Sequence, residues 1–376
     1  MTHLTYVISD RKIGGAARQL LSLSRALCDE FSVRIYLSER SELRAFFENA
    51  GVRVFPVNGL DGRSFSLADV ALFRRIFRRE NPGILHTHAA LSPRIAAKLV
   101  GDIPTVSTRH CAHAPTGERP LSRAKRSLYL RTTDITVSTA RAATANLLAE
   151  GIPADRIFTV RNGTPPCRRT TEAERQALRT SLGIPPAHRI LGCVGRLEWV
   201  KGQDLLLRAT KKLIALCPDI TLLIVGEGSE RRSLEQLASL LGLRGRVKFL
   251  GYLDDPAPVQ NLFSVNVSPS RGTETSSLAI SECMSLGIPT VASDFGGNRE
   301  MIRPGENGLL FSSDNENSLC EALARLCLSE RLRTSLSDGA RRRYQTSFTL
   351  ETMVAEYRLL YRAIAKKHLL DKRRAL

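Results

Sequence analysis

The sequence predicts an α/β protein of two doubly wound domains, each a parallel sheet flanked by helices. At 376 residues the chain exceeds the length at which one hydrophobic core usually keeps growing, so two domains are expected. Short runs rich in Val, Ile and Thr alternate with amphipathic stretches of helical length, which is typical of parallel sheets covered by helices. This alternation pauses once, after Asn162 and Gly163, and then begins again.

The expected strands fall into two sets. The first set occupies residues 4–9, 33–37, 52–57, 83–88, 104–108, 135–139 and 156–160. The second set occupies residues 189–195, 220–226, 247–251, 265–270, 290–293 and 308–311. Helices are expected throughout residues 316–372.

Between the two sets, a charged segment with flanking prolines indicates a domain boundary. We therefore expect a first domain at 1–163, a linker at 164–187, a second domain at 188–347 and a closing segment at 348–376. Open α/β sheets bind ligands at the carboxyl ends of their strands, so the two domains are expected to face a cleft that holds the site.

The composition is that of a folded protein with a strong positive charge. Hydrophobic residues make up 43% of the chain and charged residues 24%. The formal net charge of +18 favours a polyanionic partner, which leaves nucleic acid, an anionic membrane surface and phosphorylated small molecules open. No apolar run has the length of a membrane span and the first residues do not resemble a secretory leader, so a cytoplasmic location is expected. The eight cysteines show no metal-like spacing.

Two cations lie on a loop that follows a predicted strand. In GRLEWVKG (195–202), Arg196 and Lys201 precede a helix. A guanidinium and an ammonium beside a helix N-terminus suit a diphosphate, although two solvated cations on a loop are an alternative interpretation.

Two glutamates eight residues apart mark a second candidate segment. Glu274 precedes a predicted helix, and Glu282 shares an apolar face of that helix with Leu278 and Leu286. A carboxylate on such a face is costly unless a partner accepts it, which favours a ligand-facing role over a solvated one. Ser276 or Ser277 is expected to cap this helix.

Two glycine-rich turns also follow predicted strands. Gly14 and Gly15 precede a helix, where main-chain amides can approach an anion, although an ordinary turn needs the same glycines. Gly226 and Gly228 begin a dinucleotide-like pattern whose third glycine is replaced by Arg231, so a dinucleotide cofactor is not expected.

Four histidines lie near strand ends. His86 and His88 close one strand, and His110 and His113 follow the next. No Cys or acidic ligand accompanies them, so we do not expect a metal site, and His86 and His88 are equally explained by packing. His110 is placed to hydrogen-bond a substrate hydroxyl or phosphate.

In this order and at these separations, the motifs resemble the family 4 retaining glycosyltransferases of GT-B fold, a group that includes glycogen synthase and mannosyltransferase relatives. The likeness covers nearly the whole chain. Its motifs are GG (14–15), HTH (86–88), STRH (107–110), VRNG (160–163), GRLEWVKG (195–202), VGEG (225–228), FLG (249–251), the two glutamates (274–282) and SDFGGNRE (293–300).

The resemblance implies two Rossmann-like domains, with the acceptor bound to the first and a UDP- or GDP-linked sugar to the second. It also implies that residues 348–372 form a closing helix that crosses back onto the first domain. It implies that Glu274 and His110 are catalytic and that Glu282 binds the ribose. It assigns the donor diphosphate to Arg196, Lys201, Gly15, Ser277 and Leu278, and further cleft positions to Gly14, Gly226 and Asn162. It also implies a hexosyltransferase that retains anomeric configuration without a metal or cofactor, because fixed cations stabilise the departing diphosphate.

The chain departs from the family pattern at two places. After Glu274 the family often has Gly-Phe-Gly-Leu, whereas this chain has Thr275-Ser276-Ser277-Leu278. The hinge-like Asn162-Gly163 is followed by Thr164-Pro165 instead of a valine and an aspartate. The first change leaves the identity of the sugar open.

The acceptor is expected to be a glycan or a lipid-linked molecule. Two basic stretches with interleaved apolar residues, 72–82 and 119–131, suit an anionic membrane surface. We therefore expect a peripheral enzyme at the inner face of the membrane, in polysaccharide, lipopolysaccharide or glycolipid synthesis. The basic tail at 366–376 is expected to be solvated.

Three other functions remain to be compared with this interpretation. A nucleotide-sugar epimerase would share the two-domain architecture. A basic nucleic-acid-binding protein would explain the charge, but the chain has only 6% aromatic residues and no recognisable DNA-reading helix, so no nucleic-acid partner is expected. A dehydrogenase would need the complete glycine fingerprint.

Overall fold

A computed structural model describes residues 1–110 and 123–374. These residues form two compact units. The first unit contains the described residues up to Gly163 together with those from Leu350 onward, and the second contains Thr164–Thr349. Among the described residues, the chain passes into the second unit after Gly163 and returns to the first at Leu350.

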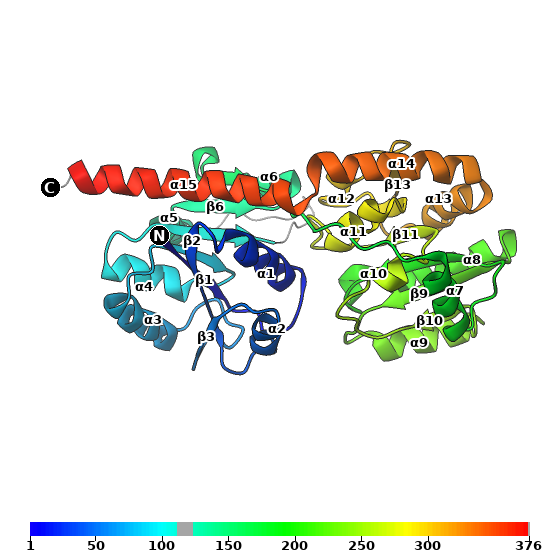
Figure 1. Ribbon diagram of the computed structural model, residues 1–376, viewed down its shortest axis with the longest axis horizontal. Helices are drawn as coiled ribbons and strands as arrows, with labels where there is room; N and C mark the ends of the chain where they lie inside the picture. The colour runs from blue at the N-terminus through cyan, green and yellow to red at the C-terminus, as the bar shows by residue number, and fades with distance from the viewer. Residues whose placement is uncertain (111–122, 375–376) are drawn as a thin grey trace. The chain divides into compact units, whose positions relative to one another are not determined.

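The first unit is built on a parallel sheet whose strand order is β3-β2-β1-β4-β5-β6-β7 (Figure 1). The order reverses between β1 and β4, and such a switch point is where doubly wound sheets bind ligands. The strands are β1 (Thr2–Ile8), β2 (Phe31–Ser38), β3 (Val54–Val57), β4 (Ile84–His88), β5 (Thr105–Arg109), β6 (Ile135–Ser138) and β7 (Ile157–Thr159).

Helices cover both faces of this sheet, because alternate residues of each strand point to opposite sides. Leu4, Tyr6 and Ile8 of β1 pack with helices α1, α2 and α15, whereas Val7 packs with α3 and α4. The helices are α1 (Gly15–Leu27), α2 (Leu43–Asn49), α3 (Leu67–Arg79), α4 (Ser92–Val100), α5 (Arg123–Thr132), α6 (Arg141–Ala149), a 3₁₀ turn (Ala154–Arg156) and α15 (Leu350–Arg374).

The second unit repeats this plan with a parallel sheet of order β10-β9-β8-β11-β12-β13. Its switch point lies between β8 and β11. The strands are β8 (Arg189–Val194), β9 (Ile220–Val225), β10 (Val247–Phe249), β11 (Val265–Ser268), β12 (Thr290–Ser293) and β13 (Gly308–Phe311).

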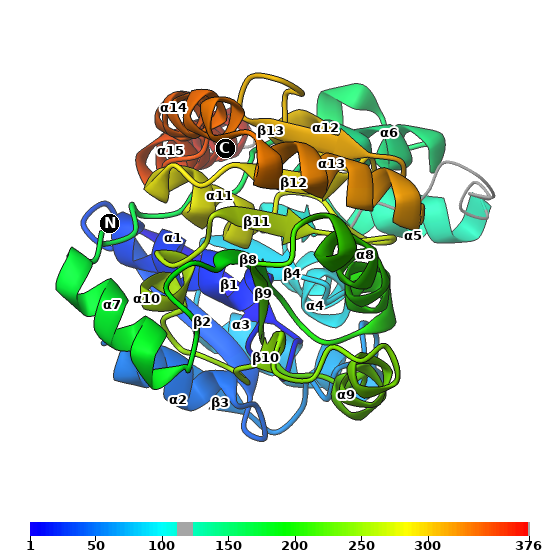
Figure 2. The same cartoon turned by 90° about the vertical axis from the view of Figure 1, so that its right-hand side faces the viewer.

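Two sets of helices enclose the second sheet (Figure 2). Helices α8, α9 and α13 pack on one face, where they bury Leu191, Leu222 and Ile224. Helices α7, α10 and α11 contact the opposite face through Ile190 and Leu223. The helices are α7 (Glu172–Ser181), a 3₁₀ turn (Trp199–Lys201), α8 (Gln203–Leu216), α9 (Arg231–Leu240), α10 (Ala257–Gln260), α11 (Leu278–Leu286), α12 (Asn298–Met301), α13 (Glu316–Leu328) and α14 (Glu330–Ser347).

The predicted fold class is confirmed, and every expected strand is present with its ends shifted by up to two residues. The segment expected to be a linker (164–187) lies within the second unit. It is held there by hydrogen bonds from the Cys167 and Thr170 main-chain N–H groups to the side chains of Ser285 (3.1 Å) and Asn261 (3.0 Å).

The closing helix α15 belongs to the core of the first unit, along which it lies (red in Figure 1). Its residues Met353, Tyr357 and Tyr361 are buried against α1 and the sheet. None of the helices among the described residues has both the length and the hydrophobicity needed to span a membrane.

Candidate functional site

The switch point of the second unit brings together the two segments that carry the predicted charges. The loop that carries Arg196 and Lys201 follows β8, and the loop that carries Glu274 follows β11. These two strands are neighbours, with Val265 paired to Leu191, and their carboxyl ends meet at the same edge of the sheet. Residues 73 positions apart in the sequence are thereby placed together.

A buried ion pair joins the two loops. The Nζ atom of Lys201 lies 2.7 Å from Oε2 of Glu274, with side-chain exposures of 24% and 8%. The 3₁₀ turn at Trp199–Lys201 ends at Gly202, whose φ of 69° only glycine adopts at low cost, and α8 begins there. A residue with a Cβ atom at Gly202 would also collide with the carbonyl oxygen of Pro269, so this turn requires glycine twice over.

Glu274 is held in its ionised form. Burial alone would raise the pKa of this carboxyl, but the charge of Lys201, its hydrogen bond and that of Ser270 together lower the pKa below 4.5. The Ser270 hydroxyl donates to Oε2 of Glu274 over 2.8 Å. A fixed carboxylate and a fixed ammonium therefore stand side by side at the sheet edge.

The loop that presents Glu274 has an unusual backbone. Thr273 has a φ of 54°, a left-handed conformation that is costly for a β-branched residue. On its other side, the Gly297 N–H donates to the Glu274 carbonyl over 3.2 Å. A Cβ atom at Gly297 would lie 1.6 Å from the carbonyl oxygen of Thr275, so this close approach requires glycine.

Arg196 differs from Lys201 in exposure. Its side chain is 54% exposed, and its guanidinium forms an ion pair with Glu198 over 2.7 Å. Its carbonyl oxygen accepts a hydrogen bond from the Gln203 side chain over 2.9 Å, which fixes the backbone of the loop. The guanidinium is therefore accessible to a ligand.

Helix α11 begins beside Glu274. Ser277 is the N-cap residue, but its hydroxyl makes no capping hydrogen bond, and its N–H donates to the sulfur of Met301 over 3.2 Å. The prediction that a serine side chain caps this helix was therefore wrong for Ser277. Since the first N–H groups of any α-helix lack intrahelical acceptors, those that begin at Leu278 can bind an anion.

Glu282 lies on α11, on the side that faces α10. It is half-buried, and its Oε2 accepts a hydrogen bond from Nε2 of Gln260 over 2.9 Å. Gln260 is fully buried, and its Oε1 has no hydrogen-bond partner within the described part of the chain. Sequence reasoning missed Gln260, because a glutamine 22 residues earlier carries no local signal of this contact.

The first unit places its histidines at its own switch point. His88 ends β4, and its Nδ1 lies 2.7 Å from Nε2 of His110, which follows β5. The rings of His86 and His88 stack with centroids 5.0 Å apart, as do those of His88 and His110. Burial lowers the pKa of His110 to about 4 and that of His86 to about 3, so these rings are neutral near pH 7.

His86 is explained by packing within the first unit. Its Nδ1 lies 2.6 Å from the Tyr361 hydroxyl of α15, and its Nε2 lies 2.6 Å from Oγ1 of Thr108. The Tyr361 hydroxyl in turn lies 2.9 Å from that of Tyr6. Helix α15 is thus tied through His86 to the strands that position His110.

Family profiles match both parts of the chain. A profile described as Glycosyltransferase Family 4 matches residues 13–168, and one described as Glycosyl transferases group 1 matches residues 174–343. Together these two profiles account for most of its length.

The chain belongs to these glycosyltransferases.

Named relatives agree with this assignment, and solved structures share the fold. A D-inositol 3-phosphate glycosyltransferase of Corynebacterium urealyticum is 32% identical over 52% of the chain, and the match spans about half, 48%, of that relative. An α-D-kanosaminyltransferase of Streptomyces kanamyceticus is 28% identical over 80% of the chain and 82% of its own length. The crystal structure of Anabaena HepE with UDP has a TM-score of 0.82 at 22% identity, covering 96% of this chain and all of that one. HepE has also been solved with UDP-glucose.

In this glycosyltransferase packing requires a glycine at Gly226 but not at Gly14 or Gly15. A Cβ atom at Gly226 would lie 2.0 Å from the carbonyl oxygen of Gly195, and its φ is 135°, so this glycine is needed for the packing of two loops. Gly14 and Gly15, at the start of α1, have nothing within 4 Å of an added Cβ atom and no positive φ. Neither packing nor backbone conformation within the first unit requires them to be glycine.

Two further positions named from the sequence are Asn162 and His113. Asn162 is buried just after β7, at the end of the first unit. His113 lies outside the described residues. Among the residues that are described, no group of three or more His, Cys, Asp or Glu side chains is arranged to hold a metal ion.

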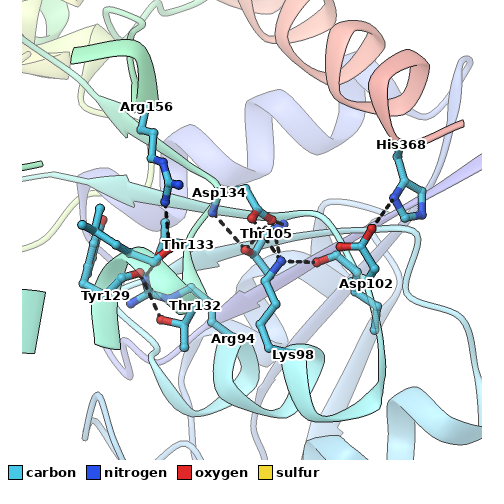
Figure 3. A network of polar contacts seen from close by, with 12 residues as sticks. Arg94, Lys98, Asp102, Thr105, Tyr129, Thr132, Thr133, Asp134, Arg156 and His368 are labelled. Atoms are coloured by element: carbon cyan, nitrogen blue, oxygen red, sulfur yellow. Dashed lines mark hydrogen bonds and ion pairs between the residues drawn. The ribbon is translucent and has the colours of Figure 1, made fainter. Parts of the chain in front are cut away.

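Figure 3 shows Tyr129 of the basic helix α5 beside Arg94 of α4 and Thr132 of the same helix. The Arg94 guanidinium lies 5.0 Å from the ring centre of Tyr129, whose hydroxyl contacts Oγ1 of Thr136 over 2.8 Å. Arg156 donates to the Leu130 carbonyl over 2.8 Å. The remaining surface of α5 is exposed, including Arg123, Lys125, Arg126, Leu128 and Arg131.

Proposed function

We propose that this glycosyltransferase moves a sugar from a nucleoside-diphosphate sugar to an acceptor hydroxyl, and that the second unit binds the donor. The observation that carries the proposal is the Lys201–Glu274 pair at the switch point of the second sheet. Such an edge is where doubly wound sheets hold nucleotides. A cation and a carboxylate fixed together suit a ligand that carries a diphosphate next to sugar hydroxyls.

The donor diphosphate is assigned to Arg196, Lys201 and the first N–H groups of α11, at Ser277 and Leu278. The accessible guanidinium of Arg196 supplies forked hydrogen bonds, and Lys201 supplies a compact charge. These groups stabilise the negative charge that develops on the departing diphosphate, which is a contribution to the rate and not only to binding. No metal is required for this role.

The ribose is assigned to Glu282. Gln260 holds one oxygen of this carboxylate in place, and a carboxylate is the group that accepts paired hydrogen bonds from a vicinal diol. Glu274 is assigned to the hydroxyls of the transferred sugar. In the first unit, the open space above Gly14 and Gly15 admits a substrate group close to the backbone, and neutral His110 hydrogen-bonds a substrate hydroxyl.

We propose a UDP- or GDP-linked hexose as donor, with retention of anomeric configuration. The support for UDP is that HepE, which shares the fold, has been solved with UDP and with UDP-glucose. The names of the relatives differ in both sugar and acceptor, so the sugar is left to experiment.

We propose a glycan or lipid-linked acceptor that is bound by the first unit, in polysaccharide or glycolipid synthesis at the inner face of a membrane. The support is the basic exposed surface of that unit, formed by α5 and by Arg74, Arg75, Arg78 and Arg79 of α3. Each such cation contributes about 1 kcal/mol of attraction to an anionic surface.

A donor screen tests the catalytic proposal. UDP-, GDP- and ADP-sugars are titrated while following the fluorescence of Trp199, the only tryptophan, which lies in the same loop as Arg196 and Lys201. We expect one nucleotide family to change the fluorescence and to raise Tm, and Glu282→Ala to weaken its binding about tenfold through loss of the ribose contact. The proposal fails if no nucleotide sugar binds and none is consumed with any acceptor.

Vesicle flotation tests the membrane proposal separately. Binding is expected to increase with the fraction of anionic lipid and to fall with salt. Arg123→Glu combined with Lys125→Glu should abolish it. The matched control, Arg331→Glu with Arg342→Glu, makes the same charge change at exposed positions of the second unit and should not. Equal binding to neutral vesicles would contradict the proposal.

A further inference from the structure

A chain of buried polar groups stands behind Glu274. Ser270 donates to Oε2 of Glu274, and the Ser270 carbonyl accepts a hydrogen bond from the Ser293 hydroxyl over 2.5 Å. Nδ2 of Asn298 lies 3.1 Å from both the carbonyl and the hydroxyl oxygens of Ser293. Ser270, Ser293 and Asn298 are at most 2% exposed. The network therefore reaches from the end of β12 and the start of α12 to the carboxylate.

The hydrogen bonds to Oε2 of Glu274 indicate what Ser270 contributes. This one oxygen accepts hydrogen bonds from both Lys201 and Ser270. Under the proposed function, the Lys201 ammonium must also serve the donor diphosphate, and its hold on Glu274 then weakens. A buried carboxylate that loses a cation is costly unless other donors remain. Ser270 and the Thr275 main-chain N–H then remain as donors to the carboxylate, and Ser270 is the one that acts through a side chain.

The strained backbone beside Glu274 is a second reason why this carboxylate needs a fixed hydrogen bond. Thr273 adopts its left-handed φ of 54° immediately before the glutamate, and strained residues persist only where their surroundings fix them. Two hydrogen bonds to the following residue, from the Ser270 hydroxyl to the Glu274 carboxylate and from the Gly297 N–H to the Glu274 carbonyl, oppose relaxation of the loop.

We propose that Ser270, supported by Ser293 and Asn298, is a positioning residue that keeps the Glu274 carboxylate in place when the donor diphosphate engages Lys201. The inference rests on the proposed function, in which Glu274 faces the transferred sugar. Ser270 itself contacts no substrate, and it acts through the orientation of Glu274. Its contribution is therefore expected in kcat and not in the binding of the nucleotide.

The kinetic test compares three serine variants. Ser270→Ala should lower kcat about tenfold while the Kd for UDP, read from Trp199 fluorescence, changes less than twofold, because the change affects the orientation of Glu274 toward the reacting sugar and not the nucleotide contacts. Ser270→Thr keeps the hydroxyl and should recover most of kcat. Ser281→Ala is the control, since Ser281 is fully buried in the same unit and its hydroxyl bonds only to its own helix. Unchanged kcat in Ser270→Ala overturns the proposal.

A second readout does not depend on activity. Ser270→Ala removes a donor to the ionised carboxylate, so the pKa of Glu274, followed by ¹³C NMR of the side-chain carboxyl, should rise, whereas Ser281→Ala should leave it unchanged. An unchanged pKa in Ser270→Ala overturns the proposal, whether or not a donor has been found. Failure of the wild-type protein to bind or consume any nucleotide sugar instead overturns the proposed function.

Discussion

The two units have the same strand order around their switch points but opposite chemistry there. In the second unit the strand ends carry an ion pair, Lys201 with Glu274, and an accessible guanidinium. In the first unit they carry neutral stacked imidazoles and two glycines with open space beside them. Topology therefore sets where a ligand can bind, and the loops that follow the strands set what it can be.

The difference arises from how each unit treats a buried ionisable group. In the second unit a buried carboxyl has an ammonium partner, and its pKa falls. In the first unit His86 contacts the hydroxyls of Tyr361 and Thr108, and burial lowers the pKa values of His86 and His110 until both rings are neutral. The first arrangement suits a charged donor, and the second suits uncharged hydroxyls.

The largest expected effect comes from removing the ammonium of the second unit. Lys201→Met should lower kcat/KM by about 10²–10³-fold, since under the proposed function it removes a charge that stabilises the departing diphosphate. It should also lower Tm, because Glu274 is left as a buried carboxylate without its cation. Both are measured on the purified protein, by initial rates and by calorimetry.

The double variant Lys201→Met with Glu274→Gln separates these two effects. Stability should return, because the uncompensated charge is gone, whereas activity should stay low. Recovery of activity together with Tm would mean that the pair serves stability alone, and the contrast between the two switch points would then lose its functional meaning.

The next effect compares glycines of the two units. Gly226→Ala should destabilise the second unit by about 3 kcal/mol, because the added Cβ atom meets the Gly195 carbonyl at 2.0 Å. Gly15→Ala should leave Tm unchanged or slightly higher, since its Cβ atom points into open space on a helix. Under the proposed function it should nevertheless lower kcat/KM about tenfold (~1.4 kcal/mol), because the added methyl group fills the space assigned to substrate. Full activity in Gly15→Ala would argue against that role.

The smallest expected effect is a loss of stability of the first unit at acidic pH. The pKa values of His86, His88 and His110 are lowered by burial, so below pH 6.5 the unfolded chain binds protons that the folded first unit does not. The contribution of these three neutral imidazoles to the stability of the first unit is therefore fully present above pH 6.5, and it is lost as pH falls toward about 4. Between pH 7 and 6 the loss should be of order 1–2 kcal/mol.

Hydrogen exchange with mass spectrometry, corrected for the pH dependence of chemical exchange, resolves the two units. The carboxylate of Glu274 has a lowered pKa, so its contribution persists until pH falls below 4.5. Protection should therefore decrease in the first unit and not around Glu274. An equal decrease in both would show that the buried imidazoles do not control acid stability.

Sequence predicted the sheets well because a buried parallel strand leaves a local pattern. The run ITLLIV is β9, with every residue buried, and its apolar character is visible without any knowledge of its neighbours. The place of segment 164–187 was harder to predict from the sequence. Hydrogen bonds from Cys167 and Thr170 to distant side chains, and not its composition, assign it to the second unit.

The site was predicted as separate charges and not as contacts. Glu282 was singled out for its place on an apolar face, yet its hydrogen-bond partner Gln260 comes from another helix. Likewise, nothing in the local sequence indicates that Lys201 and Glu274 form an ion pair. Pairing across adjacent strand ends depends on strand order, which the pattern of apolar residues does not encode.

The position of α15 has a consequence for the order in which the chain matures during translation. The described residues of the second unit, Thr164–Thr349, all precede α15, whose Met353, Tyr357 and Tyr361 complete the core of the first unit. A ribosome therefore releases every residue of the second unit before the first unit has its last helix. Until α15 is synthesised, the first unit keeps an apolar surface uncovered, and a chaperone can bind such a surface.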